Sequence, residues 1–264
     1  MPRRMPRLLG WVASVLLAAL SPAAAASAAG KHWRPGPHPT WYWQLQGRID
    51  NSRPAAVYDV DGFDTSAHEV RRLHAAGRHV VCYIDAGTWE RWRPDARAFP
   101  ASVLGRPNGW PGERWLDIRQ GVIRQIMARR FRRQCQRKHF DAVEADNIDE
   151  YQAHSGFPIT ARDQLAYDEW IARRAHALGL AVLQKNDPGQ ARTLEPYFDG
   201  VLSEQCNQYS ECSSFEPYLT AGKPVLDAEY RLPRSRFCAR DVRLGIMAAR
   251  YNLALDGRVY EPCW

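Results

Sequence analysis

The stretch FDAVEADNIDEY, residues 140–151, decides how the rest of the chain is interpreted. An apolar pair leads into three carboxylates, at Glu144, Asp146 and Asp149. In a strand, side chains two residues apart share a face, so Glu144 and Asp146 are expected to point into the same space. Carboxylates at the C-terminal end of a barrel strand suit a hydrolase. A solvated acidic turn that caps the next helix is the alternative, and the surrounding sequence has to decide between them.

The first 29 residues have the pattern of a secretory signal peptide. Arg3, Arg4 and Arg7 form a basic region, residues 8–20 are apolar, and small residues near Ala26 offer an A-x-A-like cleavage site. The apolar run is shorter than the roughly 20 residues that a membrane-spanning helix needs. We therefore expect a secreted, extracellular protein without a stable membrane anchor.

The remainder of the chain is expected to form an irregular leader over 30–39 and one domain over 40–264. The formal net charge is +7, and many arginines lie in 119–138, where apolar residues recur at helical spacing. These arginines are expected to form the solvated face of a helix rather than a nucleic-acid-binding patch. Export also argues against a nucleic-acid partner, and we expect a monomer.

Six cysteines in an exported chain predict three disulfides. One set of three pairs is plausible: Cys206–Cys212 would close a loop, Cys238–Cys263 would fix the C-terminus, and Cys82–Cys135 would join a strand to the arginine-rich helix. Other connectivities remain open at this stage. No Cys/His cluster has zinc-like spacing, so we expect neither a metal site nor a cofactor.

Strand-like and helix-like segments alternate along the domain. The predicted strands are 40–46, 55–61, 79–85, the run into Asp146, 180–187, 199–205, 224–230 and 244–252. The predicted helices are 66–76, 119–138, 160–178, 190–197 and 214–221. Residues 88–115 read as a long loop, of a length usually reserved for function. The alternation predicts parallel pairing and a (β/α)8 TIM barrel. An open doubly wound sheet is the rival, but no glycine-rich phosphate loop follows the first strand.

Polar residues gather at the C-terminal ends of these strands: Asp61, Asp85, Asp146, Lys185, Asp187, Glu204 and Glu229. Helix caps could explain one or two of them, but not acids on so many strands. Barrel active sites form at this end. An acidic cleft on a basic protein predicts a cationic substrate, because a low-dielectric cavity focuses its local field. Aromatic residues near the same end, among them Tyr83, Tyr209 and Tyr230, could bind sugar rings.

Paired carboxylates without metal ligands indicate glycoside hydrolysis, in which one acid protonates the leaving oxygen and the other is nucleophile or base. Serine chemistry lacks support because there is no G-x-S-x-G motif. Lys185 could form a Schiff base, as in barrel aldolases. Its neighbours Asn186 and Asp187 favour a charged binding residue instead.

Five segments in this order resemble glycoside hydrolase family 114: VYDVDGFD, VVCYIDAG, FDAVEADNID, LQKNDP and LSEQCNQYSEC. The family comprises secreted endo-α-1,4-polygalactosaminidases on a (β/α)8 barrel. The resemblance runs from Trp41 to the end of the chain and is most specific at 144–149 and 204–212. Ala145 stands where the family usually has proline, and NQYSEC replaces an FQYDEC-like run, which leaves the substrate choice open.

The resemblance implies cleavage of α-1,4-linked galactosamine in galactosaminogalactan-type polysaccharide, a cationic amino-sugar polymer. By motif, Asp146 resembles the family's nucleophile and Glu204 its acid/base in a retaining mechanism. The expected substrate-binding residues are Asp61, Asp85, Glu144, Asp149, Lys185, Asp187, Glu229, Tyr83, Tyr209 and Tyr230. The alternatives are a barrel that binds such a polysaccharide without cleaving it, and a glycosidase for another amino-sugar polymer.

Overall fold

The structure is a computed structural model that describes Met1 and residues 32–264. The expected signal segment therefore lies, apart from Met1, outside the described residues. Within the described part of the chain, no helix combines the length and the apolar character needed to cross a bilayer.

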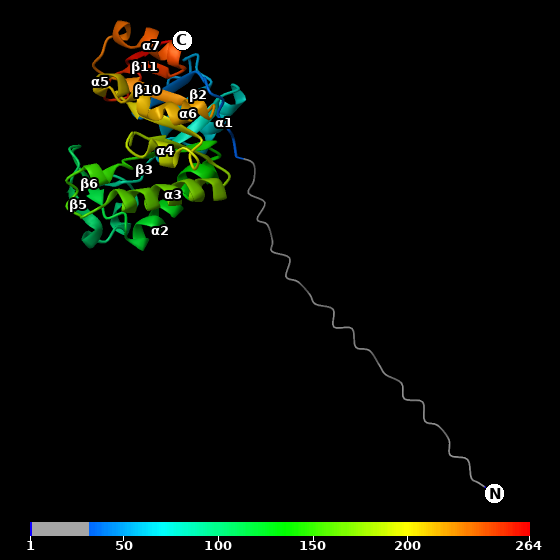
Figure 1. The fold of residues 1–264 in the computed structure, drawn as a ribbon, viewed down its shortest axis with the longest axis vertical. Coiled ribbons are helices and arrows are strands. Elements are labelled where there is room, and N and C mark those ends of the chain that lie inside the picture. Colours follow the sequence, from blue (N-terminus) through cyan, green and yellow to red (C-terminus); the bar gives the residue numbers. More distant parts are fainter. Residues whose placement is uncertain (2–31) are drawn as a thin grey trace.

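Eight parallel strands form the barrel. Their bounds are β1 Trp41–Gln44, β2 Val57–Asp61, β3 His79–Asp85, β7 Ala142–Asp146, β8 Ala181–Lys185, β9 Gly200–Glu204, β10 Val225–Glu229 and β11 Met247–Tyr251. The strands follow one another in chain order around the sheet, and β12, Tyr260–Pro262, pairs antiparallel with β11. Side chains of β2, β8 and β10 are buried throughout, as expected for parallel strands covered on both faces. The predicted (β/α)8 fold is confirmed (Figure 1).

Side-chain hydrogen bonds bridge the seam between β1 and β11. The backbone N–H of Trp43 donates to the Tyr251 hydroxyl at 3.2 Å, and the Trp41 indole N–H donates to the Met247 carbonyl at 2.7 Å. From β12, the Tyr260 hydroxyl donates to the Trp41 carbonyl at 2.8 Å. The aromatic residues of the first strand thus close the barrel.

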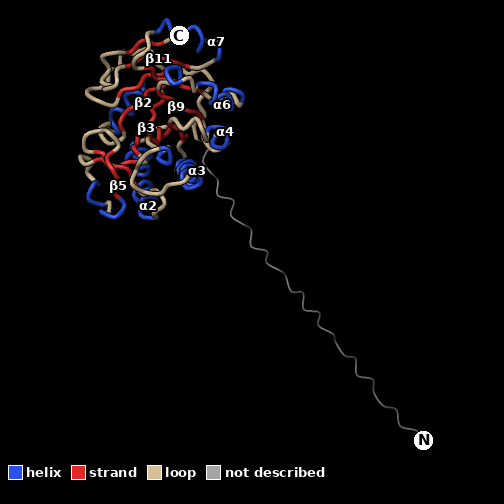
Figure 2. Tube along the Cα trace, turned by 60° about the vertical axis from the view of Figure 1, so that its left-hand side comes forward, coloured by secondary structure: helices blue, strands red, loops and turns tan. Residues whose placement is uncertain are grey.

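Over residues 32–264 the structure has seven α-helices. They lie around the strands, as the blue and red segments of Figure 2 show. Their bounds are α1 Ala67–Ala75, α2 Gly121–Arg130, α3 Ala161–Ala177, α4 Ala191–Leu194, α5 Cys206–Tyr209, α6 Glu216–Thr220 and α7 Cys238–Leu244. The sequence predicted neither α5 nor α7. Leu244, which was assigned to the last strand, is the final residue of α7 instead.

The arginines of this segment are exposed or half-buried, as predicted, except Arg130, where the sequence interpretation is wrong. Arg130, at the end of α2, has a side chain that is 1% exposed. Its guanidinium pairs with Asp95 at 3.0 Å and donates to the Asp85 carbonyl at 3.0 Å. The buried guanidinium joins α2 to the segment that follows β3.

The predicted loop over 88–115 contains a small antiparallel sheet. Its strands are β4 Thr88–Glu90, β5 Leu104–Pro107 and β6 Glu113–Leu116, in the order β4-β6-β5. We call this the lateral sheet; β5 and β6 lie beside α2, away from β10 and β11 (Figure 1). Its strands are only three or four residues long and are separated by proline and glycine, so they show no clear alternation of apolar and polar residues.

The cysteines form the set of three pairs described in the sequence analysis. The disulfides are Cys82–Cys135, Cys206–Cys212 and Cys238–Cys263. The first joins β3 to the π-helical turn Phe131–Cys135 that continues α2. The last fixes the C-terminal segment to α7.

One sequence pattern occurs twice at the end of the barrel where the strands begin. HAAGRHVV at 74–81 matches HALGLAVL at 176–183, and FDAV at 140–143 matches FDGV at 198–201. The Asp141 carboxylate is hydrogen-bonded to His74 at 2.8 Å and to a backbone N–H of β3 at 2.7 Å. Asp199 is likewise bonded to His176 at 2.8 Å and to a backbone N–H of β8 at 2.9 Å. We call these two groups the floor clamps.

Candidate active site

Three neighbouring strands place charged side chains together at their C-terminal ends. Asp146 ends β7, Lys185 ends β8 and Glu204 ends β9. The Lys185 ammonium lies 2.8 Å from Asp146 Oδ1, 2.9 Å from Glu144 Oε1 and 3.2 Å from Glu204 Oε2. Glu144 and Asp146 thus reach the same ammonium, as their spacing in the strand predicted.

The chain turns sharply directly after each of these strands. Asn147, Asn186 and Gln205 follow the three strands with φ values of 58°, 47° and 59°. L-residues seldom adopt this left-handed conformation, and such strain gathers at functional sites. Gly87 allows one of the turns, because a Cβ there would lie 1.7 Å from the Asn147 carbonyl oxygen.

The carboxylates of Asp146 and Glu204 also accept hydrogen bonds from uncharged side chains. The Tyr83 hydroxyl donates to Asp146 Oδ2 at 2.8 Å. The Tyr230 hydroxyl donates to Glu204 Oε1, and the Asn186 amide donates to Glu204 Oε2 at 3.1 Å. Both carboxylates are therefore fixed in orientation before any ligand binds.

Lys185 determines the ionisation state of Asp146. Burial alone would raise the pKa of Asp146, but the Lys185 ammonium and the Tyr83 hydroxyl outweigh burial and hold that pKa below its usual range. Burial would lower the pKa of Lys185, but Asp146, Glu144 and Glu204 together raise it well above its usual value. A lysine held protonated is no nucleophile, which argues against Schiff-base chemistry.

A second pair of carboxyls lies beneath Lys185 in the barrel interior. Asp59 is 1% exposed, and burial together with Glu144 raises its pKa well above the ordinary value. Burial also raises the pKa of Glu144, to about 7, against the opposing effect of Lys185. The raised pKa favours the neutral carboxyl at Asp59, which can donate to Glu144.

These groups face a cleft of about 490 Å³. Seven of the twelve predicted catalytic and binding residues line it: Asp61, Tyr83, Asp146, Asp149, Lys185, Glu204 and Tyr230. Asp61 is engaged by Arg93, which contacts its two oxygens at 3.0 and 2.6 Å. Burial, followed by Asp146, raises the pKa of Asp149 to about 6.

Five predicted binding residues do not line the cleft: Asp85, Glu144, Asp187, Glu229 and Tyr209. Asp187 accepts hydrogen bonds from Tyr151 and Gln152 at 2.9 and 3.2 Å. Glu229 accepts backbone N–H groups from the first turn of α5, at 2.8 and 3.2 Å. These two acids hold the loops around the site.

Asp85 and Tyr209 also lie outside the set of residues that line the cleft. Asp85 is 1% exposed, accepts the backbone N–H of Thr88 at 2.8 Å and the Asn147 amide at 3.1 Å, and so fixes the turns after β3 and β7. Tyr209 is 57% exposed, at the end of α5.

A family model described as glycoside-hydrolase family GH114 matches residues 22–263. The chain belongs to this family. It is a glycoside hydrolase, and the predicted family is confirmed.

Solved structures share the fold of this GH114 enzyme. Ega3 of Aspergillus fumigatus, in a crystal structure with galactosamine, is 30% identical, with a TM-score of 0.83 over 89% of this chain and 98% of that one. The glycoside hydrolase domain of PelA from Pseudomonas aeruginosa is 14% identical, with a TM-score of 0.64 over 83% of this chain and 96% of that one. An uncharacterised protein of Deinococcus radiodurans is 27% identical over 242 residues, 78% of this chain and 74% of its own length.

Among the residues that the structure describes in this GH114 enzyme, two groups of side chains have ligand atoms within 4.8 Å of one another, close enough for a metal ion. They are Asp85, Glu90 and Glu113, and His32, His176 and Asp199. In the first group, Glu90 already pairs with Arg93 at 2.7 Å. In the second, both imidazoles are hydrogen-bonded to Asp199 and stack at 4.3 Å. Contacts within the chain account for both groups.

The sequence interpretation missed several groups of the GH114 site. Asn186 directly follows Lys185, and its position after a strand could have indicated a role. Asp59 was not among the strand-end acids singled out for the site. Glu113 and Trp110 lie in the lateral sheet and its loops, where no periodic pattern was available to place them in the cleft.

Proposed function

We propose that this enzyme is a secreted, endo-acting hydrolase that cleaves α-1,4-linked galactosamine in galactosaminogalactan-type polysaccharide with retention of configuration. The observation that carries the proposal is the pairing of Asp146 and Glu204 across one lysine. The complex of Ega3 with galactosamine supports the choice of sugar, because Ega3 is 30% identical over most of both chains.

The geometry favours retention. Asp146 Oδ1 and Glu204 Oε2 both contact the Lys185 ammonium, at 2.8 and 3.2 Å. Those oxygens can be no farther apart than the two contacts together, about 6 Å, which suits the roughly 5–5.5 Å of retaining enzymes better than the roughly 6.5–9.5 Å of inverting ones.

In the first step, the Asp146 carboxylate attacks the anomeric carbon while Glu204 gives its proton to the departing glycosidic oxygen. The glycosidic C–O bond breaks and a glycosyl ester of Asp146 forms. In the second step, Glu204 takes a proton from water, the water oxygen bonds to the anomeric carbon, and the ester bond breaks. Lys185 assists by keeping Asp146 ionised, and Tyr83 fixes the oxygen to which it donates.

The charge of the cleft supports a cationic amino-sugar substrate. Asp149, Glu113 and Asp64 line it in addition to Asp146 and Glu204. Ammonium groups on a deacetylated polymer would compensate these carboxylates, and the cleft would attract the polymer despite the positive net charge of the chain. Export is consistent with the three disulfides.

The test is incubation of the purified protein with deacetylated galactosaminogalactan and mass spectrometry of the products. We expect galactosamine oligomers of several lengths from wild type, an α-anomer as the first product by NMR, and at least about 10³-fold slower release by Asp146→Asn and Glu204→Gln. A first product in the β-configuration would exclude retention. Polymer binding without any products would favour the binding protein over the enzyme for this substrate.

A further inference from the structure

The lateral sheet supplies one wall of the cleft. Trp92, Trp110, Glu113 and Trp115 belong to the 88–116 excursion, and all four line the cleft together with the catalytic pair. Connections between a barrel strand and its helix usually take only a few residues, so an excursion of this length indicates an added function.

Two indole side chains on this wall remain open to solvent. Trp92 is 54% exposed and Trp110 is 51% exposed, although tryptophan is usually largely buried. The Trp92 ring lies against Gly112, which has a φ of 90° and where a Cβ would stand 3.1 Å from the ring. Glycine at this position allows the indole to lie close against the backbone.

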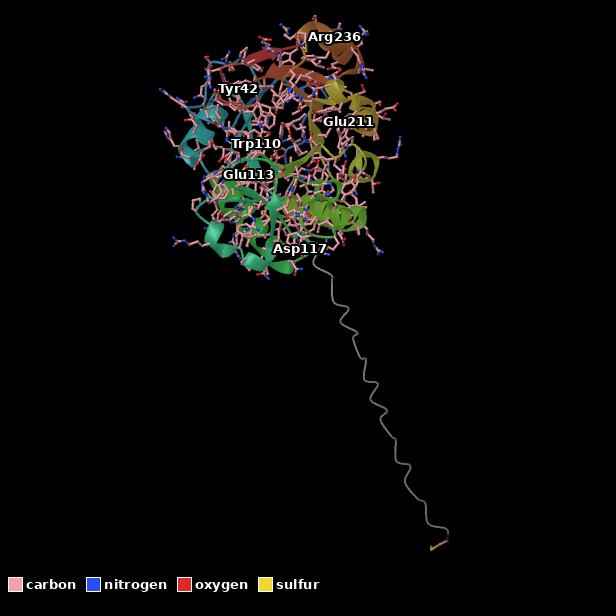
Figure 3. The ribbon with its side chains drawn as sticks, turned by 90° about the vertical axis from the view of Figure 1, so that its left-hand side faces the viewer. Tyr42, Trp110, Glu113, Asp117, Glu211 and Arg236 are labelled. Atoms are coloured by element: carbon pink, nitrogen blue, oxygen red, sulfur yellow. A yellow bond between two sulfur atoms is a disulfide. The ribbon has the colours of Figure 1, made fainter. Side chains whose placement is uncertain are left out.

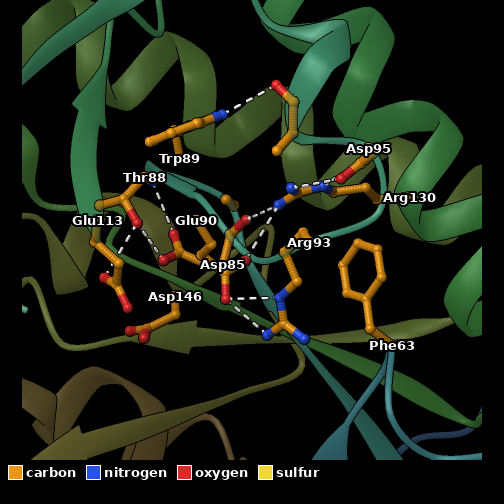
Figure 4. Close-up of polar contacts among 12 residues, drawn as sticks. Phe63, Asp85, Thr88, Trp89, Glu90, Arg93, Asp95, Glu113, Arg130 and Asp146 are labelled. Carbon is orange, nitrogen blue, oxygen red and sulfur yellow. Dashed lines mark hydrogen bonds and ion pairs between the residues drawn. The ribbon is translucent and has the colours of Figure 1, made fainter. Parts of the chain in front are cut away.

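One side chain connects the backbone of Trp110 to a carboxylate. Asn108 accepts the backbone N–H of Trp110 at 3.0 Å through its oxygen and donates to Glu113 Oε2 at 2.7 Å through its nitrogen. Thr88 Oγ1 lies 3.4 Å from the same Glu113 oxygen. Trp110 and Glu113 are labelled close together in Figure 3, and Figure 4 shows the carboxylates of Glu113 and Asp146 near each other.

Glu113 lacks a cationic partner. Within the described part of the chain, no Lys, Arg or His forms an ion pair with it; its contacts are Asn108 and Thr88. Burial, followed by the nearby Asp85, raises its pKa to about 7. A partly buried carboxylate among other acids is stabilised when a cation binds beside it.

We propose that Glu113, Asn108, Trp92 and Trp110 form a second sugar subsite, which binds an amino-sugar residue adjacent to the cleaved bond. The ammonium group of that sugar pairs with Glu113, and its apolar C–H face packs on an indole. This inference rests on the proposed function and extends it, because it assigns the preference for free amines over acetamides to residues outside the catalytic pair. An acetamide carries no charge and adds a bulky acyl group at this carboxylate.

The test measures oligomer binding by calorimetry in the Glu204→Gln variant, so that no turnover occurs. Adding Glu113→Gln should weaken binding of deacetylated galactosamine oligomers by about 10-fold and leave binding of fully N-acetylated oligomers unchanged, since the lost contact is a charge-assisted hydrogen bond. Adding Trp110→Ala instead should weaken binding of both oligomers, because ring packing does not depend on the amine.

Matched controls are Glu216→Gln, which removes an exposed carboxylate on α6, and Trp264→Ala, which removes an indole that is 39% exposed and outside the cleft. Neither should change the affinity. If the Glu113→Gln protein bound deacetylated oligomers as tightly as the protein that keeps Glu113, the proposal would be overturned. Binding of Ca²⁺ by wild type that is lost in Glu113→Gln would also overturn it, because the carboxylate would then be a metal ligand. Polymer cleavage by wild type is measured separately and decides the proposed function, whichever result the subsite gives.

Discussion

At the residue scale, Lys185 is the group on which the proposed chemistry depends. It contacts three carboxylates and holds the pKa of Asp146 below its usual range. We expect Lys185→Met to lower kcat/KM at pH 7 by about 100-fold, the scale found when one preorganised polar contact is removed. Without the cation the pKa of Asp146 rises, so the acidic limb of the pH profile of kcat/KM moves to higher pH.

The control for this variant is Lys223→Met, which removes a lysine paired with Glu195 outside the cleft. Circular dichroism checks that both variants fold. An acidic limb that stays in place in Lys185→Met would show that the lysine does not set the ionisation of the nucleophile.

Asp59 and Asp146 offer a direct comparison of a buried and a half-buried aspartate. The raised pKa of Asp59 favours its neutral carboxyl, so Asp59→Asn replaces one neutral hydrogen-bond donor with another, and we expect kcat within about 3-fold of wild type. Asp146→Asn removes the proposed nucleophile and should lower kcat by about 10³-fold or more. If rate measurements at pH 7 found the two variants equally inactive, the assignment of the proton to Asp59 would be wrong.

The sequence located the two proposed catalytic acids but not the network around them. Asp146 and Glu204 could be predicted because each ends an apolar strand and lies in a recognisable motif. The contacts of Lys185 depend on the register of β7, β8 and β9, where Ala145 lies opposite Gln184 and Lys185 opposite Leu202. Register between parallel strands is a tertiary property, and no spacing within one strand determines it.

At the scale of elements, the disulfides should differ in their effect on stability and on activity. The chain-entropy model predicts a loss of about 4 kcal/mol when the Cys82–Cys135 bridge is removed, and about 2 kcal/mol for Cys206–Cys212, because the first closes a segment of 53 residues and the second one of 6. Paired Cys→Ala variants followed by urea unfolding would test this order.

The activity of the same variants should follow the opposite order. Cys206 begins α5, two residues after Glu204, and its backbone N–H donates to Asp227 at 3.1 Å. Loss of the short bridge should therefore lower kcat more than loss of the long one. A larger loss of activity without Cys82–Cys135, measured where both variants remain folded, would contradict this expectation.

Elements with strong local patterns were the predictable ones. The strands of the barrel showed continuous apolar runs because they are buried on both faces. The helices α1 and α3 are capped by Ser66 and Thr160, whose side chains accept N–H groups of the first turn. The lateral sheet lacked such a pattern, since its short strands are joined by proline- and glycine-containing turns. Arg130 was misplaced because its partner, Asp95, lies 35 residues away in the chain.

At the scale of the whole molecule, the acidic cleft and the basic surface have opposite effects on a cationic polymer. Attraction into the cleft should weaken as salt screens charges, since the Debye length falls from about 30 Å at 0.01 M to about 8 Å at 0.15 M. We expect KM for the deacetylated polymer to rise with NaCl concentration while kcat changes little. Steady-state kinetics on a soluble polymer would measure this; a KM independent of salt would remove the electrostatic argument.

The floor clamps have a consequence for the opposite end of the barrel. Asp141 and Asp199 stand the same number of residues before Asp146 and Glu204, and a strand rises about 3.3 Å per residue, so each pair is separated by about 16 Å. Two strands of equal length, fastened in the same way at their base, bring the two acids to a common height. The equal lengths of the two strands thus set the positions of the two acids along the barrel. A residue inserted into β9 alone would turn Glu204 away from the cleft, since a shift of one position exchanges the two faces of a strand.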